Sequence, residues 1–221
     1  MTDTLAYVLR KFDIALNGQK SPIVVPNFGR SELAAMFAEL GFTKGVEVGV
    51  NRGEYSEVLL KANPNLHLYG VDHYLAYSAY RELSQERQDE CRAEAHKRLA
   101  SYESEGRYQF IEKPSVEAAR EFPDGALDYC YIDASHKLQD VVNDICEWSR
   151  VVRPGGICAG HDFVRRTRNR DGSPNTSLHV VQAVTAYTQA YSIHPYFILG
   201  RRSAREGEVR DKARSWCWIK S

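Results

Sequence analysis

The sequence predicts an α/β fold built around a mostly parallel sheet. Short apolar runs alternate along the chain with longer, more polar stretches of helical composition, and this alternation is typical of βαβ units. The length of 221 residues suits one ordinary α/β domain. With 43% hydrophobic and 11% aromatic residues, the composition is that of a globular chain rather than a disordered one.

Seven apolar runs are the expected strands. The clearest boundary is the turn signal Arg153-Pro154-Gly155, which precedes the fifth run. In chain order the expected strands are 45–50, 66–71, 108–111, 127–132, 156–160, 196–199 and 216–219.

The intervening stretches are the expected helices. Residues 138–151 show the pattern well, because their apolar residues recur at helical spacing. Ser115 follows a proline and is expected to cap a short helix. The expected helices are 55–62, 80–102, 115–121, 138–151 and 178–191. Residues 1–40 are expected to form a helical N-terminal extension with a loop at 20–30, and residues 41–221 the main domain.

Charge and cysteine usage narrow the class of protein. Lysine plus arginine number 29 and aspartate plus glutamate number 29, so no global basic field favours a nucleic-acid partner. No apolar run approaches the roughly 20 residues that span a bilayer. The five cysteines form no Cys-x-x-Cys pair, and residues 1–20 lack the apolar core of a signal peptide, so we expect a reduced, cytoplasmic protein. The sequence leaves the oligomeric state open.

A glycine-containing loop follows the first expected strand. Gly49 and Gly53 allow a sharp turn and a close ligand approach, although an ordinary strand-to-helix turn has the same pattern. Asn51 and Glu54 stand where a dinucleotide-binding loop has glycines. The acidic side chains of Glu47 and Glu54 would compete with a diphosphate, so a ligand with a positive end, such as an amino acid or a sulfonium, fits better.

Asp72 ends the second expected strand, about 20 residues beyond the loop. Ligands of open α/β sheets bind at the carboxyl ends of strands, where a carboxylate can accept both ribose hydroxyls of an adenosine. The alternative is a helix cap or a turn residue. The glycine loop favours the ribose interpretation.

These motifs together resemble the class I S-adenosylmethionine-dependent methyltransferases. The resemblance rests on Glu47-x-Gly49-x-x-x-Gly53, Asp72, Asp133 after the fourth expected strand, and Arg153-Pro154-Gly155-Gly156, and it extends over about four-fifths of the chain. It implies a Rossmann-like seven-stranded sheet, mostly parallel with an antiparallel last strand, and helices on both faces. It implies S-adenosylmethionine as cofactor, with these candidate binding residues: Glu47, Gly49, Asn51, Gly53, Asp72, Ser115 and Asp133.

Two segments narrow the resemblance. Tyr131-Ile132-Asp133-Ala134-Ser135-His136 and the segment 155–163 resemble the metal-dependent macrolide-sugar and small-molecule O-methyltransferases. This implies catalytic roles for Asp133 and His136, with His136 as general base, and a divalent cation held by Asp133 and Asp162. His161 stands where the sugar enzymes have glutamate, and it is the third candidate ligand.

The chemistry of these residues agrees with a cation site. Two carboxylates at the ends of adjacent strands would repel one another, and a divalent cation resolves that conflict. Mg²⁺ is the first expectation, whereas a histidine ligand would favour Mn²⁺ or Fe²⁺. His136, at the start of the next helix, is suited to accept a hydroxyl proton. In the alternative, Asp133 and His136 are helix caps and Asp162 is a turn residue.

The sequence therefore predicts methyl transfer from S-adenosylmethionine to a hydroxyl of a small molecule, assisted by a divalent cation. Two alternatives stay open: a metal-independent methyltransferase acting on oxygen or nitrogen, and a non-catalytic module that binds S-adenosylmethionine or a nucleoside. Arg165, Arg166, Arg168 and Arg170 follow the expected cation site. They form either a solvated face or a lid that recognises an acidic or phosphorylated substrate. The expected acceptor is an acidic or sugar-containing small molecule.

Overall fold

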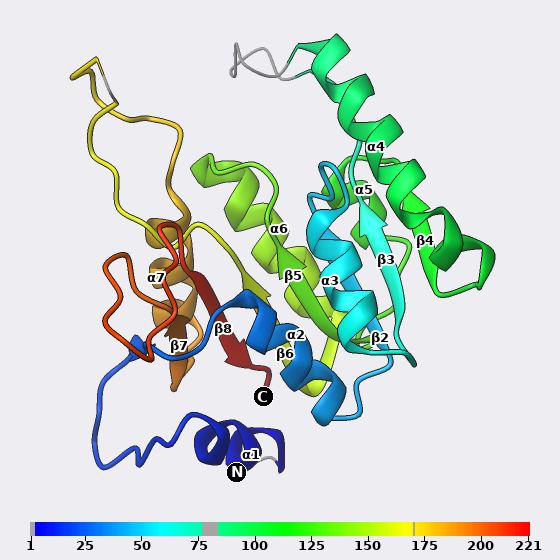
Figure 1. The fold of residues 1–221 in the computed structure, drawn as a ribbon. Coiled ribbons are helices and arrows are strands. Elements are labelled where there is room, and N and C mark those ends of the chain that lie inside the picture. The colour runs from blue at the N-terminus through cyan, green and yellow to red at the C-terminus, as the bar shows by residue number, and fades with distance from the viewer. Residues whose placement is uncertain (1–2, 77–83, 170) are drawn as a thin grey trace.

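The computed structural model describes residues 3–76, 84–169 and 171–221, and in these ranges seven helices and eight strands alternate along the chain (Figure 1). The helices are α1 (Asp3–Lys11), α2 (Arg30–Glu39), α3 (Glu54–Ala62), α4 (Gln85–Ser104), α5 (Ser115–Ala119), α6 (Leu138–Val151) and α7 (Val180–Ala190). The strands are β1 (Ile23–Val25), β2 (Lys44–Val48), β3 (His67–Val71), β4 (Tyr108–Ile111), β5 (Leu127–Ile132), β6 (Val152–Gly160), β7 (Tyr196–Leu199) and β8 (Ser215–Ile219).

The strands form one mostly parallel sheet in the order β1-β7-β8-β6-β5-β2-β3-β4. β8 pairs antiparallel with both β6 and β7, whereas the other neighbouring strands are parallel. The last strand of the chain therefore lies inside the sheet, between β7 and β6 (Figure 1). This arrangement confirms the predicted parallel sheet with its antiparallel last strand.

The predicted number of seven strands is wrong, because the described residues contain eight. The additional strand, β1, lies in the segment 20–30 that was expected to be a loop, and it pairs in parallel with β7. It is only three residues long and stands between Pro22 and Pro26. So short a run between two prolines carries the sequence signal of a loop, and only pairing with β7 makes it a strand. The division at residue 40 into extension and main domain stays a prediction.

Helices cover both faces of the sheet, as predicted. One core packs α1 to α4 against strand residues such as Tyr129 and Tyr131, which point to one face. A second core packs α5 to α7 against Val46, Val48 and Trp216 on the opposite face. Since successive strand residues point to opposite faces, alternate side chains of a strand belong to the two different cores.

Several boundaries differ from the predicted ones. β6 begins at Val152 and includes the expected turn, because the register with β5 shifts and Gly155 takes a left-handed conformation within the strand. α6 begins at Leu138, so Ser135 and His136 lie before the helix rather than in its first turn. α4 is described from Gln85 on; the predicted start at Tyr80 lies outside the described residues. The remaining ends agree within about two residues.

The topology brings the candidate residues to one edge. β2, β3, β5 and β6 are neighbouring parallel strands, so their carboxyl ends meet at the same side of the sheet. The glycine loop, Asp72, Asp133 and Asp162 follow these four strands in turn. In the described ranges, the helices are all too short or too polar to cross a membrane.

Candidate active site

The glycine loop is packed tightly against the end of β5. Gly49, Asn51 and Gly53 all adopt left-handed conformations, with φ of 94°, 52° and 72°. A Cβ on Gly49 would lie 2.3 Å from the backbone oxygen of Asp133. Glycine is therefore required at position 49 by its φ and by the close approach of β5. A larger residue there would displace Asp133 as well as narrow the ligand's path.

Asp72 ties the glycine loop to β3. Its Oδ2 accepts hydrogen bonds from the backbone N–H groups of Val50 and Asn51, both at 3.0 Å, and its Oδ1 accepts one from Tyr74 at 3.0 Å. Three of the four lone pairs of the carboxylate are thus engaged, and Oδ1 keeps one for a ligand hydroxyl. The structure places Asp72 at the carboxyl edge of the sheet, beside the glycine loop, and its contact with ribose stays a prediction.

Glu47 lies beneath the loop in what we call the Glu47 cluster, formed by Glu47, Ser56 and Tyr108. Glu47 is 2% exposed and accepts a hydrogen bond from the Ser56 hydroxyl. The Ser56 oxygen lies 3.4 Å from the Tyr108 hydroxyl. Burial raises the pKa of Glu47 to about 8, so the carboxyl is protonated at neutral pH. The negative charge that the sequence placed at this position is therefore absent near neutrality.

Ser115 is engaged in packing between α5 and α6. Its hydroxyl accepts a hydrogen bond from Trp148 Nε1 at 2.9 Å and donates one to the buried Asp144. Pro114, not Ser115, is the residue that caps α5. A contact between Ser115 and the cofactor stays a prediction.

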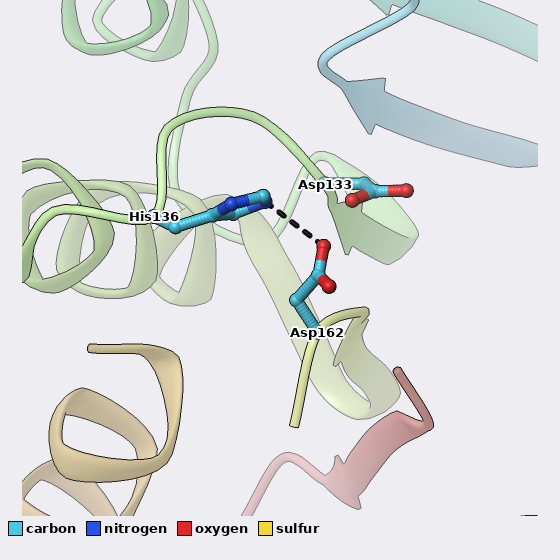
Figure 2. Close-up of side chains that lie close together, drawn as sticks. All are labelled: Asp133, His136 and Asp162. Atoms are coloured by element: carbon cyan, nitrogen blue, oxygen red, sulfur yellow. Dashed lines mark ion pairs between the residues drawn. The ribbon is translucent and has the colours of Figure 1, made fainter. Parts of the chain in front are cut away.

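Asp133, His136 and Asp162 converge at the ends of β5 and β6 (Figure 2). Asp133 follows β5, His136 comes from the segment before α6, and Asp162 follows β6. One potential ligand atom from each residue lies within 4.8 Å of those of the other two. His136 Nε2 is 2.9 Å from Asp162 Oδ2, which is a direct hydrogen-bond distance.

The backbone at Asp162 aims its side chain into this cluster. Asp162 has a φ of 57°, a left-handed conformation that is uncommon outside glycine and asparagine. Burial would raise the pKa of Asp162, but the hydrogen bond from His136 and the nearby imidazole of His161 outweigh burial and lower it. Asp162 is therefore a carboxylate throughout the neutral range.

His161 lies on the other side of Asp162 and has a further partner that the sequence analysis missed. His161 Nε2 is 3.2 Å from Asp211 Oδ2, and its Nδ1 is 3.8 Å from Asp133 Oδ2 and 3.7 Å from Asp162 Oδ2. Asp211 lies 50 residues away in sequence, on the segment between β7 and β8. No local motif marks it. We call Asp133, His136, His161, Asp162 and Asp211 the acid–histidine cluster.

Opposite charges balance one another in the acid–histidine cluster. Burial would lower the pKa of His161, but the nearby carboxylate of Asp162 and the hydrogen bond with Asp211 raise it to about 10. Burial and the nearby Asp162 raise the pKa of Asp133, although His161 and His136 oppose the change. Burial also opposes charge on His136, whose pKa is nevertheless raised by Asp162. Three acids and two imidazoles thus share one small volume at the edge beside the glycine loop.

The donor set suits a divalent cation. Two carboxylates and an imidazole within 4.8 Å of one another match the ligands that Mn²⁺, Fe²⁺ and Zn²⁺ accept, and the carboxylates alone match Mg²⁺. A cavity of about 10 Å³ adjoins Asp133, His136 and His161. This volume is close to the smallest that holds a particle of the size of one water molecule. The residues present therefore fit the cation that the sequence led us to expect.

Comparisons with known proteins agree with this fold. Residues 46–163, more than half of the chain, match the family model described as a methyltransferase domain. No curated protein matches the sequence. An O-methyltransferase from Bacillus cereus, solved with SAH, superposes with a TM-score of 0.58 at 15% identity, covering 100% of this chain and 92% of that one.

Two further structures show the same fold. The O-methyltransferase TomG from Streptomyces achromogenes, solved with SAM, gives a TM-score of 0.56 at 15% identity, covering 100% of this chain and 91% of that one. An O-methyltransferase family protein from Burkholderia thailandensis gives 0.56 at 16% identity over 86% of this chain. The match spans only 55% of that longer protein. The chain therefore belongs to the methyltransferase-domain family and has the fold of the class I S-adenosylmethionine-dependent methyltransferases.

Proposed function

We propose that the protein transfers the methyl group of S-adenosylmethionine to a hydroxyl of a small molecule, with a divalent cation bound beside the reacting oxygen. The observation that carries the proposal is the convergence of Asp133, His136 and Asp162 next to a glycine loop that packs on Asp133 itself. A cofactor held by the loop would thus present its methyl group toward the acid–histidine cluster.

The glycine loop and Asp72 supply the cofactor site. The bare backbone at Gly49 and Gly53 admits a ligand closely, and Oδ1 of Asp72 retains a lone pair for a ribose hydroxyl. The ionised acids at the neighbouring strand end suit the positive sulfonium better than a diphosphate. We therefore expect S-adenosylmethionine and S-adenosylhomocysteine to bind, and NAD not to bind.

His136 is the proposed general base. The substrate oxygen attacks the methyl carbon, the carbon–sulfur bond breaks to release S-adenosylhomocysteine, and the hydroxyl proton passes to the imidazole. Because Nε2 is hydrogen-bonded to Asp162, Nδ1 carries the lone pair that accepts this proton. Asp162 then stabilises the imidazolium that forms, and it holds the ring in one orientation.

Asp133 and Asp162, together with a histidine nitrogen, would hold the cation. When bound, a divalent cation lowers the pKa of a coordinated hydroxyl and keeps its oxygen in line with the methyl donor. The alternative without a cation also has support in the geometry, because the 2.9 Å pair of His136 and Asp162 is already a base with its orienting acid. Chelation separates the two forms of the proposal.

An acidic acceptor is favoured by the arginines that border the site. The segment 163–179 begins next to Asp162, and its far end returns to the cluster where the His179 N–H donates to the His136 carbonyl at 2.8 Å. Arg165 and Arg166 are exposed on this segment, and neither has a carboxylate within ion-pair distance in the described part of the chain. The predicted fourth arginine, at 170, lies outside the described residues.

The test combines binding and turnover. Calorimetry is expected to show S-adenosylhomocysteine binding without NAD binding. Release of S-adenosylhomocysteine is then followed over a panel of small hydroxyl compounds, each carboxylic acid paired with its neutral amide, before and after chelation. We expect turnover of acids in preference to amides and loss of turnover after chelation, restored by Mn²⁺ or Mg²⁺.

Matched variants sharpen the test of the acceptor. The double variant Arg165→Ala with Arg166→Ala is expected to raise KM for the acids alone, whereas Arg120→Ala, an exposed arginine at the end of α5, is the control. Full activity after exhaustive chelation would select the metal-independent form. Binding without any turnover over the panel would support the non-catalytic module.

A further inference from the structure

Three hydrogen bonds, none of which involves Nδ1, hold His161 in place. Its backbone N–H donates to the Ile132 carbonyl at 3.0 Å, and its own carbonyl accepts a hydrogen bond from Trp216 Nε1 at 3.0 Å. The third contact is the 3.2 Å approach of Nε2 to Asp211 Oδ2. The side chain is only 14% exposed, so the ring has one stable orientation.

Asp211 is itself fixed by the segment between β7 and β8. Its N–H donates to the Arg201 carbonyl and its Oδ1 accepts from the Ala213 N–H, both at 2.9 Å. The same segment is joined to the end of β1, because the Val209 N–H donates to the Pro26 carbonyl at 2.8 Å. These contacts leave Oδ2 of Asp211 directed at His161. The additional strand β1 thus supports a residue of the acid–histidine cluster.

The contact with Asp211 assigns the two nitrogens of His161. A carboxylate only accepts hydrogen bonds, so Nε2 must carry a hydrogen. Nδ1 then faces Asp133 and Asp162 at 3.8 and 3.7 Å, which is longer than a direct N–H···O hydrogen bond. Nδ1 and the two carboxylates thus lie close together without a direct hydrogen bond, and Nδ1 would give up its hydrogen when a cation binds beside it. A carboxylate that orients a histidine through its far nitrogen is a common support for a metal ligand.

His136 lacks such a support. In the ranges that the structure describes, Asp162 is the carboxylate within ion-pair distance of His136, and no second acid holds its other nitrogen. His136 and His161 both approach Asp162, and in the described ranges a second carboxylate, that of Asp211, holds the far nitrogen of His161 alone. This asymmetry separates a fixed histidine from one whose second nitrogen remains available to a substrate.

We propose that Asp211 is a positioning residue, which holds His161 with Nδ1 toward Asp133 and Asp162 so that these three residues supply the cation's ligands and leave His136 to act as the base. The inference rests on the cation of the proposed function. It assigns the two histidines different tasks and gives the segment 200–214 a part in the site.

The test measures cation binding in the absence of turnover. Mn²⁺ is titrated into protein saturated with S-adenosylhomocysteine, and the unbound ion is followed by electron paramagnetic resonance. Loss of a residue that orients a metal ligand typically lowers affinity by about 10- to 100-fold, and we expect this loss in Asp211→Ala. Asp211→Asn is expected to lose less, because its amide oxygen can still accept the hydrogen of Nε2.

Two further variants show that the effect passes through His161. His161→Ala is expected to weaken Mn²⁺ binding at least as much as Asp211→Ala. The double variant should bind no more weakly than His161→Ala, because Asp211 then has no histidine to orient. In metal-free protein, nuclear magnetic resonance of ¹⁵N-labelled histidine is expected to show a hydrogen on Nε2 of His161 that is hydrogen-bonded to Asp211, and Asp211→Ala should lose that signature.

A control on the same segment separates positioning from loosening. Glu208 accepts the Arg205 N–H at 2.9 Å and pairs with Arg201 at 3.3 Å, so Glu208→Ala disturbs the segment without touching His161. An equal loss of Mn²⁺ affinity in Glu208→Ala would overturn the proposal, as would unchanged affinity in Asp211→Ala. Wild-type protein that binds S-adenosylhomocysteine but not Mn²⁺ would also overturn the proposal. The metal-independent form of the proposed function would then still stand. Failure to bind S-adenosylhomocysteine would instead count against the proposed function itself.

Discussion

Glu47 in the Glu47 cluster and Asp162 in the acid–histidine cluster are two acids whose pKa values are shifted in opposite directions. In the described part of the chain, the Ser56 hydroxyl is the hydrogen-bond partner of Glu47, and burial raises the pKa of Glu47 to about 8. Asp162 is half-buried, with 21% of its side chain exposed, and two imidazoles lower its pKa. Deep burial beside a hydroxyl thus raises the pKa of one acid, whereas two imidazoles lower the pKa of a half-buried one.

The difference separates a structural acid from a chemical one. A protonated carboxyl such as Glu47 fills space and donates or accepts neutral hydrogen bonds, but it holds no cation. A carboxylate kept ionised between two histidines can bind a metal ion or stabilise an imidazolium. The comparison therefore favours the ends of β5 and β6, rather than the interior of β2, as the place of the proposed chemistry.

The largest effect is expected at Asp162, since it is the shared partner of both histidines. Asp162→Ala removes the acid that orients His136 and one ligand of the proposed cation. We expect turnover to fall by about 10³- to 10⁴-fold, while S-adenosylhomocysteine affinity measured by calorimetry is almost unchanged. The control is Asp171→Ala, which changes an exposed aspartate on the segment 163–179. Wild-type turnover in Asp162→Ala would show that Asp162 has no part in the chemistry.

His136 is expected to give the next largest effect. His136→Ala removes the proposed base and should lower kcat by about 10²- to 10³-fold, with S-adenosylhomocysteine still binding. His194→Ala, an exposed histidine, is the control and should keep wild-type kcat. If His136→Ala only lowers thermal stability and leaves kcat intact, His136 is a structural residue.

Much of the fold and the candidate site could be predicted because the signals are local. Gly49, Gly53 and Asp72 belong to one strand–loop–helix–strand unit, and Asp133 and Asp162 each directly follow an apolar run. Parallel strands then bring their carboxyl ends together without any further information. The residue types at these ends were sufficient to predict where charge would gather.

The parts that the sequence did not reveal depend on distant contacts. β1 is a strand only because β7 lies beside it, and Asp211 reaches His161 only because the segment 200–214 folds back over β6. Glu47 was expected to be charged, and its neutral state follows from burial by α3 and β4, which no short motif encodes. Partners distant in the chain determine each of these properties.

The structural half of the comparison can be tested through the pH dependence of stability. Between pH of about 4.5 and 8, folded Glu47 keeps a proton that the unfolded chain releases, so the free energy of unfolding should fall as pH rises. Glu47→Gln removes this dependence and should be more stable than wild type at pH 9 by as much as a few kcal/mol, with little difference at pH 5. Urea unfolding at both pH values measures it. Equal stability of the two proteins at pH 9 would mean that folding does not raise the pKa of Glu47.

Asp144 supplies a third buried acid and the smallest expected effect. It is 3% exposed on α6, and burial raises its pKa to about 6 although the Ser115 hydroxyl opposes the shift. Because the raised pKa belongs to the folded state, stability should fall as pH rises from about 4 to 6 and stay level above that window. Asp144→Asn should therefore gain as much as about 3 kcal/mol at pH 7 and almost nothing at pH 4. Urea unfolding at both pH values measures this gain, with Glu206→Gln, on an exposed turn, as the control. A loss of stability at pH 7 would show that Asp144 is held as a carboxylate, and hydroxyl partners would then suffice to keep a buried acid charged.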